Sequence, residues 1–148
     1  MIRIALNFLL LLFYSTTSYS SEINILSDIL EVDKKNKDTV FIGNVYAIHN
    51  DLEIWSDKVT IFFRDESDEI KEIVAKTKVK IKRGDMVALG NTANYKPSKN
   101  ILTINGNVKV QEKDNIINCD ELVLDLNKST SIMSSYSSNR VNAIIINN

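Results

Sequence analysis

Two segments of this chain repeat the same strand, bend and strand, and that repeat limits the possible folds more than any other sequence feature. Residues 104–124 begin INGNVKV and continue, after a polar break, with NIINCDELVL; residues 41–61 begin FIGNVYA and continue with DLEIWSDKVTI. Gly43 and Asp57 are fourteen residues apart, as are Gly106 and Asp120. A fixed period is typical of repeat architectures, so we expect a series of similar units.

Two weaker copies become visible once this register is set. Residues 75–95 match the unit with Thr77 in place of the glycine and an asparagine in place of the aspartate, and residues 23–32 match only its second strand. The aspartate positions are spaced 29, 34 and 29 residues apart, which indicates four structural corners rather than one metal site: Asp28, Asp57, Asn91 and Asp120. We predict a β-bulge or bend at each corner, because Asp and Asn side chains bond nearby backbone N–H groups.

The repeats also predict which side chains face inward. Val, Ile, Thr and Asn fill short runs separated by polar turns, so we expect an all-β chain. Apolar and polar residues alternate, and only one face is apolar in every copy. A sheet folded at the corners would enclose that face as an elongated trough. We expect the trough to be lined by Phe41, Val45, Ala47, Ile54, Ala75, Val79, Ile81, Ala88, Ile104, Val108, Val110, Ile117, Leu122 and Leu124.

The first twenty residues have the pattern of a secretory signal peptide. Arg3 precedes an apolar run of about eleven residues, shorter than the ~18 that a membrane span needs, and Ser18 and Ser20 fit a cleavage site after Ser20. An uncleaved anchor is the less favoured alternative. We therefore expect a periplasmic or secreted protein in which residues 21–148 form one domain.

Composition excludes several function classes. Without Arg3, the mature chain has 17 basic and 19 acidic residues, a net charge of −2, which argues against a nucleic-acid-binding protein. The single histidine, His49, lies in a turn without a motif around it, and no catalytic or paired-cysteine motif is present in the sequence. We therefore predict neither enzymatic activity nor a cofactor. Four alternating lysines at 76, 78, 80 and 82 fit either a site for lipid phosphates or, preferably, a solvated face.

At this point the sequence resembles the OstA/LptA family of lipopolysaccharide-transport proteins. The features that carry the resemblance are the signal peptide, the repeated Gly-Asn-Val strand, its Asp corners and the 90–95 segment (GNTANY). The resemblance implies a taco-like β-jellyroll whose apolar groove holds the lipid A acyl chains. It also implies an LptC-like inner-membrane partner, an LptD-like outer-membrane barrel domain and head-to-tail self-association.

Several alternatives remain open beside this interpretation. The inward residues could pack a closed core instead of binding lipid. The chain could also be an anchored LptC-type relative, or a β-domain that stacks without lipid. For stacking, the chain offers an apolar last strand at 141–146 that lacks the Lys or Pro which usually protects an edge. We expect the assembly edges to include Ile23, Ile25, Val141, Ala143 and Ile145.

Overall fold

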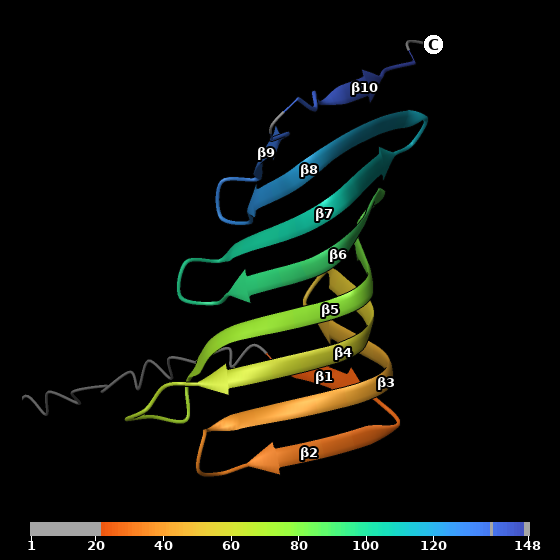
Figure 1. Ribbon diagram of the computed structural model, residues 1–148. Coiled ribbons are helices and arrows are strands. Elements are labelled where there is room, and N and C mark those ends of the chain that lie inside the picture. The colour runs from red at the N-terminus through yellow and green to blue at the C-terminus, as the bar shows by residue number, and fades with distance from the viewer. Residues whose placement is uncertain (1–21, 137, 147–148) are drawn as a thin grey trace, which may run out of the picture.

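The computed structural model describes residues 22–136 and 138–146, which form ten β-strands in a single sheet (Figure 1). The expected signal peptide at residues 1–20, its cleavage after Ser20, and Ser137 lie outside this range. No helix in the described ranges could cross a membrane. The strands are β1 (Ile23–Leu26), β2 (Ile29–Asp33), β3 (Asp38–His49), β4 (Leu52–Phe63), β5 (Ile70–Arg83), β6 (Met86–Lys96), β7 (Ile101–Glu112), β8 (Asn115–Asp125), β9 (Thr130–Ser134) and β10 (Asn142–Ile144).

Every strand pairs antiparallel with its neighbours, in the order β1-β3-β4-β5-β6-β7-β8-β10. β2 also pairs with β3, and β9 also pairs with β8, so each edge of the sheet is a strand split in two. The half unit at residues 23–32 is the first split strand. The sequence does not predict the path of the serine-rich stretch at residues 129–138, which begins as β9 along the second half of β8. The all-β prediction is confirmed.

The bulges lie on the strands next to the predicted corners, which corrects the sequence-based expectation. Gly43 and Asn44 on β3 stand opposite Asp57 alone, and both have positive φ angles of 80° and 47°. The same two-against-one arrangement recurs at residues 77–78 on β5, opposite Asn91, and at 106–107 on β7, opposite Asp120. Along each corner strand, the inward-facing positions still switch between odd and even residue numbers at the corner. They switch because the corner strand has one residue where its partner strand has two.

The corners divide the sheet into two layers that face each other. The rings of His49, at the end of β3, and Tyr95, near the end of β6, lie 5.9 Å apart although the two residues are on opposite sides of the corners. The first layer contains β1, β10 and residues 45–49, 52–56, 79–83, 86–90, 108–112 and 115–119; the second contains β2, β9 and residues 38–42, 58–63, 70–76, 92–96, 101–105 and 121–125. Figure 1 shows the strands curving through this bend along one side of the molecule.

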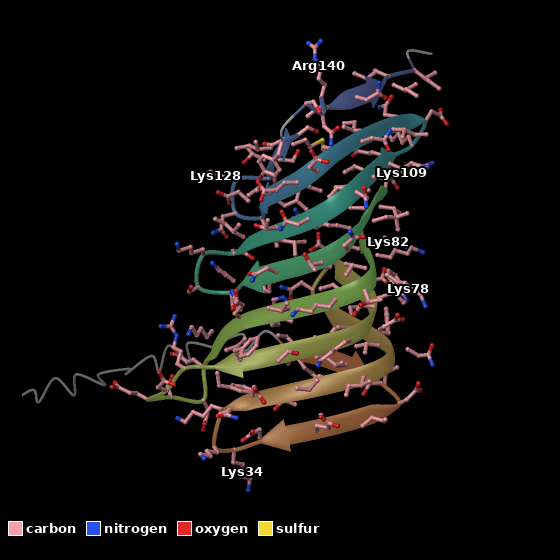
Figure 2. All side chains as sticks on the ribbon, viewed as in Figure 1. Lys34, Lys78, Lys82, Lys109, Lys128 and Arg140 are labelled. Carbon is pink, nitrogen blue, oxygen red and sulfur yellow. The ribbon has the colours of Figure 1, made fainter. Side chains whose placement is uncertain are left out.

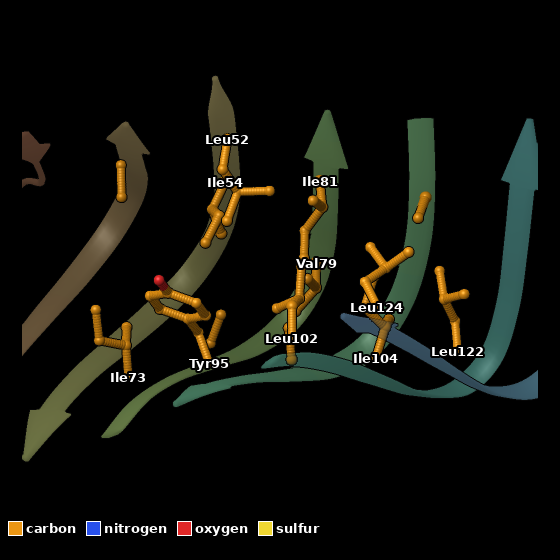
Figure 3. Close-up of a cluster of buried hydrophobic side chains, with 14 of the residues drawn as sticks. Leu52, Ile54, Ile73, Val79, Ile81, Tyr95, Leu102, Ile104, Leu122 and Leu124 are labelled. Carbon is orange, nitrogen blue, oxygen red and sulfur yellow. The ribbon is translucent and has the colours of Figure 1, made fainter. Parts of the chain in front are cut away.

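The core fills the space between the layers. Ile81, Leu102, Ile104 and Leu122 are fully buried, and they come from three different strands. Figure 3 shows these side chains pointing into one shared interior. Burying each such side chain stabilises the fold by about 1.5–3 kcal/mol, so the apolar face that alternates along every repeat holds the two layers together.

Candidate functional site

The predicted trough residues all lie on the inward face of the folded sheet. Phe41 and Ile117 are only partly buried and pack against the core, whereas the other twelve are nearly or fully buried. The buried ones are Val45, Ala47, Ile54, Ala75, Val79, Ile81, Ala88, Ile104, Val108, Val110, Leu122 and Leu124. The repeat register therefore brings residues from six strands, β3 to β8, into one apolar interior.

The interior contains eight further apolar residues that the predicted set omits. Leu52 has the same parity as Ile54, and Leu102 has the same parity as Ile104, so both follow the alternation of the repeats. The complete additional group is Leu52, Val59, Ile61, Ile73, Ala93, Tyr95, Leu102 and Cys119. Burial raises the pKa of the Cys119 thiol, and Asp120 beside it raises that pKa further, so this cysteine is a poor nucleophile in the folded protein.

Within the described ranges the apolar interior is densely filled by side chains and contains a small cavity of about 20 Å³. Residues of both layers line it, with Ile23 and Ile25 of β1 on one side and Ile73, Tyr95 and Leu102 on the other. This volume is comparable to that of a single water molecule. The lining is almost wholly apolar, so the cavity has few groups that could hold water by hydrogen bonds. An acyl chain could enter only if the two layers move apart.

Polar contacts line the free margin of the second layer beside this cavity. Tyr95 is 5 % exposed, and its hydroxyl donates a hydrogen bond of 2.8 Å to Asn100 Oδ1. The Asn100 amide in turn donates to Asn127 Oδ1 at 2.8 Å, which ties the β6–β7 turn to the β8–β9 turn. Burial raises the pKa of the Tyr95 phenol, so it remains protonated and able to donate. His49 covers the same margin from the first layer.

Three of the four corner residues lie against a bulge on a neighbouring strand. The Asn44 amide donates to Asp28 Oδ2 at 2.8 Å, and the Asp28 N–H donates to the Gly43 carbonyl at 3.0 Å. At the next corner, Lys78 Nζ lies 3.4 Å from Asp57 Oδ2. The third corner, Asn91, packs against Gly106, where an added Cβ would lie 2.6 Å from Asn91 Nδ2.

The last corner closes the sheet's end in a different way. Asp120 Oδ2 accepts a 2.8 Å bond from the Tyr136 N–H and a 3.4 Å bond from the Asn139 amide. No group of three or more His, Cys, Asp or Glu residues suited to a metal occurs in the part of the chain that the structure describes.

The predicted assembly edges fall at both ends of the sheet, with differences in detail. Ile23 and Ile25 belong to edge strand β1, but their side chains face the cavity. At the other end the strand is shorter than predicted, because β10 contains Ala143 while Val141 and Ile145 flank it. Both edges carry further exposed apolar side chains beside the five predicted edge residues, namely Leu26, Ile29, Leu30 and Val32 at the first edge and Ile132, Ile144 and Ile146 at the second.

Comparison with known proteins identifies the family. Residues 24–130 match the family described as LptA/(LptD N-terminal domain) LPS transport protein. No curated protein matches the chain. Among solved structures, LptH, the LptA-homologous periplasmic component of the lipopolysaccharide transport device of Pseudomonas aeruginosa, superposes with a TM-score of 0.75 at 16% identity, covering 86% of this chain and 96% of LptH.

These matches confirm both the resemblance and the jellyroll fold inferred from the sequence. The LptH likeness establishes the fold, and the family match, which spans more than half of the chain, establishes the lineage. The family is one of transport proteins, not enzymes, in agreement with the prediction from sequence. The chain belongs to the family of LptA and LptD amino-terminal-domain lipopolysaccharide-transport proteins.

Proposed function

We propose that this protein is a periplasmic lipopolysaccharide carrier that holds lipid A acyl chains between the two layers of its sheet. The observation that carries this proposal is the apolar interior, which continues beyond the buried core to both edges. Leu30 and Val32 of β2 pair with Phe41 and Thr39 and so belong to the inward rows, yet they are 57% and 60% exposed. A closed globular core would cover such residues. An interior that continues into another molecule would leave them uncovered in the free protein.

Energetics favour a sheltered path for the lipid. Exposing a fourteen-carbon acyl chain to water costs on the order of 10 kcal/mol, at ~0.8 kcal/mol per CH₂. The interior must open to accept such a chain, since its cavity holds only about 20 Å³. An inserted acyl chain would cover the apolar side chains of both layers as they separate, so opening in the presence of lipid costs far less than opening in water.

The two edges of the sheet support the proposed assembly. β9 runs antiparallel to β8, and β2 runs antiparallel to β3, so β9 of one copy placed against β2 of the next continues the antiparallel alternation. Met133 on β9 pairs with the buried Leu122 and packs against the core, so the inward row of β9 would continue beside Leu30 and Val32 of the next copy's β2. Open edges of this kind invite strand addition, and a head-to-tail contact of unlike edges extends without closing. We infer that an LptC-like domain and an LptD-like domain dock on the same two edges.

Site-specific photo-crosslinking in Gram-negative cells tests the interior path. Ile104 is fully buried between the layers, and its neighbour Thr103 on β7 has the opposite parity and faces outward, which provides a matched control on the same strand. The proposal expects a lipopolysaccharide adduct from a probe at Ile104 and none from a probe at Thr103. Protein adducts alone at Ile104 would favour the alternative, a β-domain that stacks on partners with a closed core.

Localisation is tested separately by fractionation and amino-terminal sequencing. A carrier of this kind should be recovered in the soluble periplasmic fraction with Ser21 as its first residue. Recovery in the inner-membrane fraction with residues 1–20 retained would instead identify an anchored, LptC-type relative.

A further inference from the structure

The outer surface of the bend carries a cluster of lysines that edge protection does not explain. Lysines commonly protect the edge strands of a sheet against pairing with other chains. Here the lysine row lies on β5, which has β4 and β6 on its two sides and is therefore an interior strand. Strands β4 and β7 add two further lysines, Lys58 and Lys109. All six are exposed, and together they form the basic surface: Lys58, Lys76, Lys78, Lys80, Lys82 and Lys109.

Most of this positive charge is not neutralised. Lys78 pairs with Asp57 at 3.4 Å and Lys82 pairs with Glu53 at 3.6 Å. Within the described ranges, the other four lysines of the basic surface have no carboxylate within ion-pairing distance. Lys58 even lies directly opposite Lys76 across β4 and β5, an arrangement that disfavours folding. A sequence that keeps this repulsion in the middle of its sheet is consistent with an anionic partner for the surface.

Aromatic and aliphatic side chains occupy the same outer face. The register places Tyr46, Trp55, Lys80, Leu89 and Lys109 side by side on five consecutive strands. The Tyr46 and Trp55 rings are 5.2 Å apart, and Lys80 Nζ lies 4.9 Å from the centroid of the Trp55 ring. Leu89 is 42% exposed. Figure 2 shows Lys78, Lys82 and Lys109 on the side of the sheet where the strands bend.

We propose that this basic surface, with Trp55 and Leu89 in it, binds the anionic headgroup region of a lipid bilayer. Each positive side chain near an anionic leaflet contributes its own attraction, and no shaped pocket is needed. This mode of binding suits lysines that are spread over several strands. Trp and Tyr favour the boundary between water and acyl chains, where one end of the ring is apolar and the other wet. Leu89 adds an apolar contact at the same level.

The chemistry of the cations favours a bilayer over an acidic protein. All six are lysines, whose compact, mobile ammonium groups attract charge without fixed geometry. Arginine, which forms planar two-point bonds to carboxylates, is the usual choice at a specific protein interface. The arginine that follows this row on β5, Arg83, is already bonded to Asp51 at 2.8 Å. This surface lies outside the interior, so the inference is independent of the proposed lipid path.

Vesicle binding tests the inference, and Trp55 provides an intrinsic probe because it is the single tryptophan of the chain. The wild-type protein should bind vesicles that contain phosphatidylglycerol but not vesicles of phosphatidylcholine alone, with a blue shift of Trp55 fluorescence. Binding should weaken with added salt, since the Debye length falls from ~30 Å at 0.01 M to ~8 Å at 0.15 M. The double variant K80Q/K109Q should bind roughly 30-fold more weakly, at about fivefold per lysine.

A matched variant separates surface charge from total charge. K34Q/K35Q removes the same charge from the exposed β2–β3 turn, away from the basic surface in Figure 2. It should bind vesicles like wild type. Equal losses in the two variants, absence of vesicle binding at low salt, or binding of soluble polyglutamate without binding of vesicles would each overturn the inference. Lipopolysaccharide crosslinking at Ile104 should be retained in K80Q/K109Q, which keeps this result distinct from failure of the carrier function.

Discussion

The contact between corner and bulge can be tested by comparing two glycine substitutions. Gly106 has a φ of +83°, and a Cβ added there would lie 2.6 Å from Asn91 Nδ2 and 3.0 Å from Asn91 Cβ. Gly84, in the turn after β5, has a φ of +57° and no atom within 4 Å of an added Cβ. Gly106→Ala therefore introduces both backbone strain and a steric clash, whereas Gly84→Ala introduces backbone strain alone.

The expected free energies follow from these two terms. An L-residue in the left-handed region costs about 1–2 kcal/mol, offset by ~0.4–1 kcal/mol because alanine restricts the unfolded chain. Gly84→Ala should therefore lower the free energy of unfolding by about 1 kcal/mol. Overpacking adds roughly 1–3 kcal/mol at Gly106, because the Asn91 Cβ is tied to the backbone of a paired strand and cannot rotate away. Gly106→Ala should lower the free energy of unfolding by about 2–4 kcal/mol.

Urea denaturation in a double-mutant cycle isolates the clash. Asn91→Gly removes every Asn91 side-chain atom near the added Cβ, so Gly106→Ala in that background should cost only as much as Gly84→Ala. The coupling free energy between positions 91 and 106 should then be about 1–3 kcal/mol. Additive effects at the two positions, or equal costs for the two single glycine variants, would refute the packing of the corner against the bulge.

Three further predictions concern strain, opening and pH. Thr77 has a φ of +68° at the position where the two full copies have glycine, so Thr77→Gly should raise the free energy of unfolding by up to ~1 kcal/mol in urea titrations. A lower free energy of unfolding in this variant would contradict backbone strain at Thr77. Cys119 should react with a thiol reagent at pH 8 on the order of 100-fold more slowly when folded than in urea; equal rates would mean open layers. The hydrogen bond from Arg83 lowers the pKa of Asp51 in the folded protein below its ordinary value of 3.8. The stability that this pair contributes should therefore be complete above pH 3.8 and be lost as the pH falls through the folded-state pKa of Asp51. Because the pair is largely exposed, Asp51→Asn should lower the free energy of unfolding by under about 1 kcal/mol at pH 7 and should reduce the loss of stability at acidic pH. An unchanged loss of stability at acidic pH would exclude this pair as its cause.

The sequence predicts inward and outward faces well because alternation is a local property. Val108 and Val110 alternate with Lys109, and burial follows the same alternation. The change of parity at Asp57 and Asp120 is likewise visible in the sequence, since apolar residues on either side are separated by an odd number of positions. The repeat then extends these inward and outward assignments to the middle copy, in which Thr77 replaces the glycine and Asn91 replaces the aspartate.

The interpretation of the sequence placed the bulge on the wrong strand, because two-against-one pairing depends on which residue of a neighbouring strand takes the positive φ. The repeat pattern points to the corner residues as the site of the irregularity, whereas Gly43 and Asn44 adopt it and Asp28 bonds to them. Asn tolerates the left-handed region, so its presence after the glycine was the signal that the interpretation missed. The sequence also could not predict whether the interior is densely packed, because a packed core and a lipid groove are lined by the same types of residue.

The carboxyl-terminal edge is where the structure constrains the two layers least. At the inner bulges two residues join the halves of a strand, but seven residues lie between Ser134 of β9 and Asn142 of β10. Asp120 also bonds a loop N–H and the Asn139 amide here in place of a bulge on a paired strand. This longer link couples the two layers less tightly than a two-residue bulge does. We therefore expect the layers to separate at this edge with the least loss of hydrogen bonding. Hydrogen exchange should therefore be fastest in β10 and at the start of β8, and slowest in β5 and β6. Uniform exchange along the sheet would show that the layers open as one unit, and a lipid would then have no preferred end at which to enter.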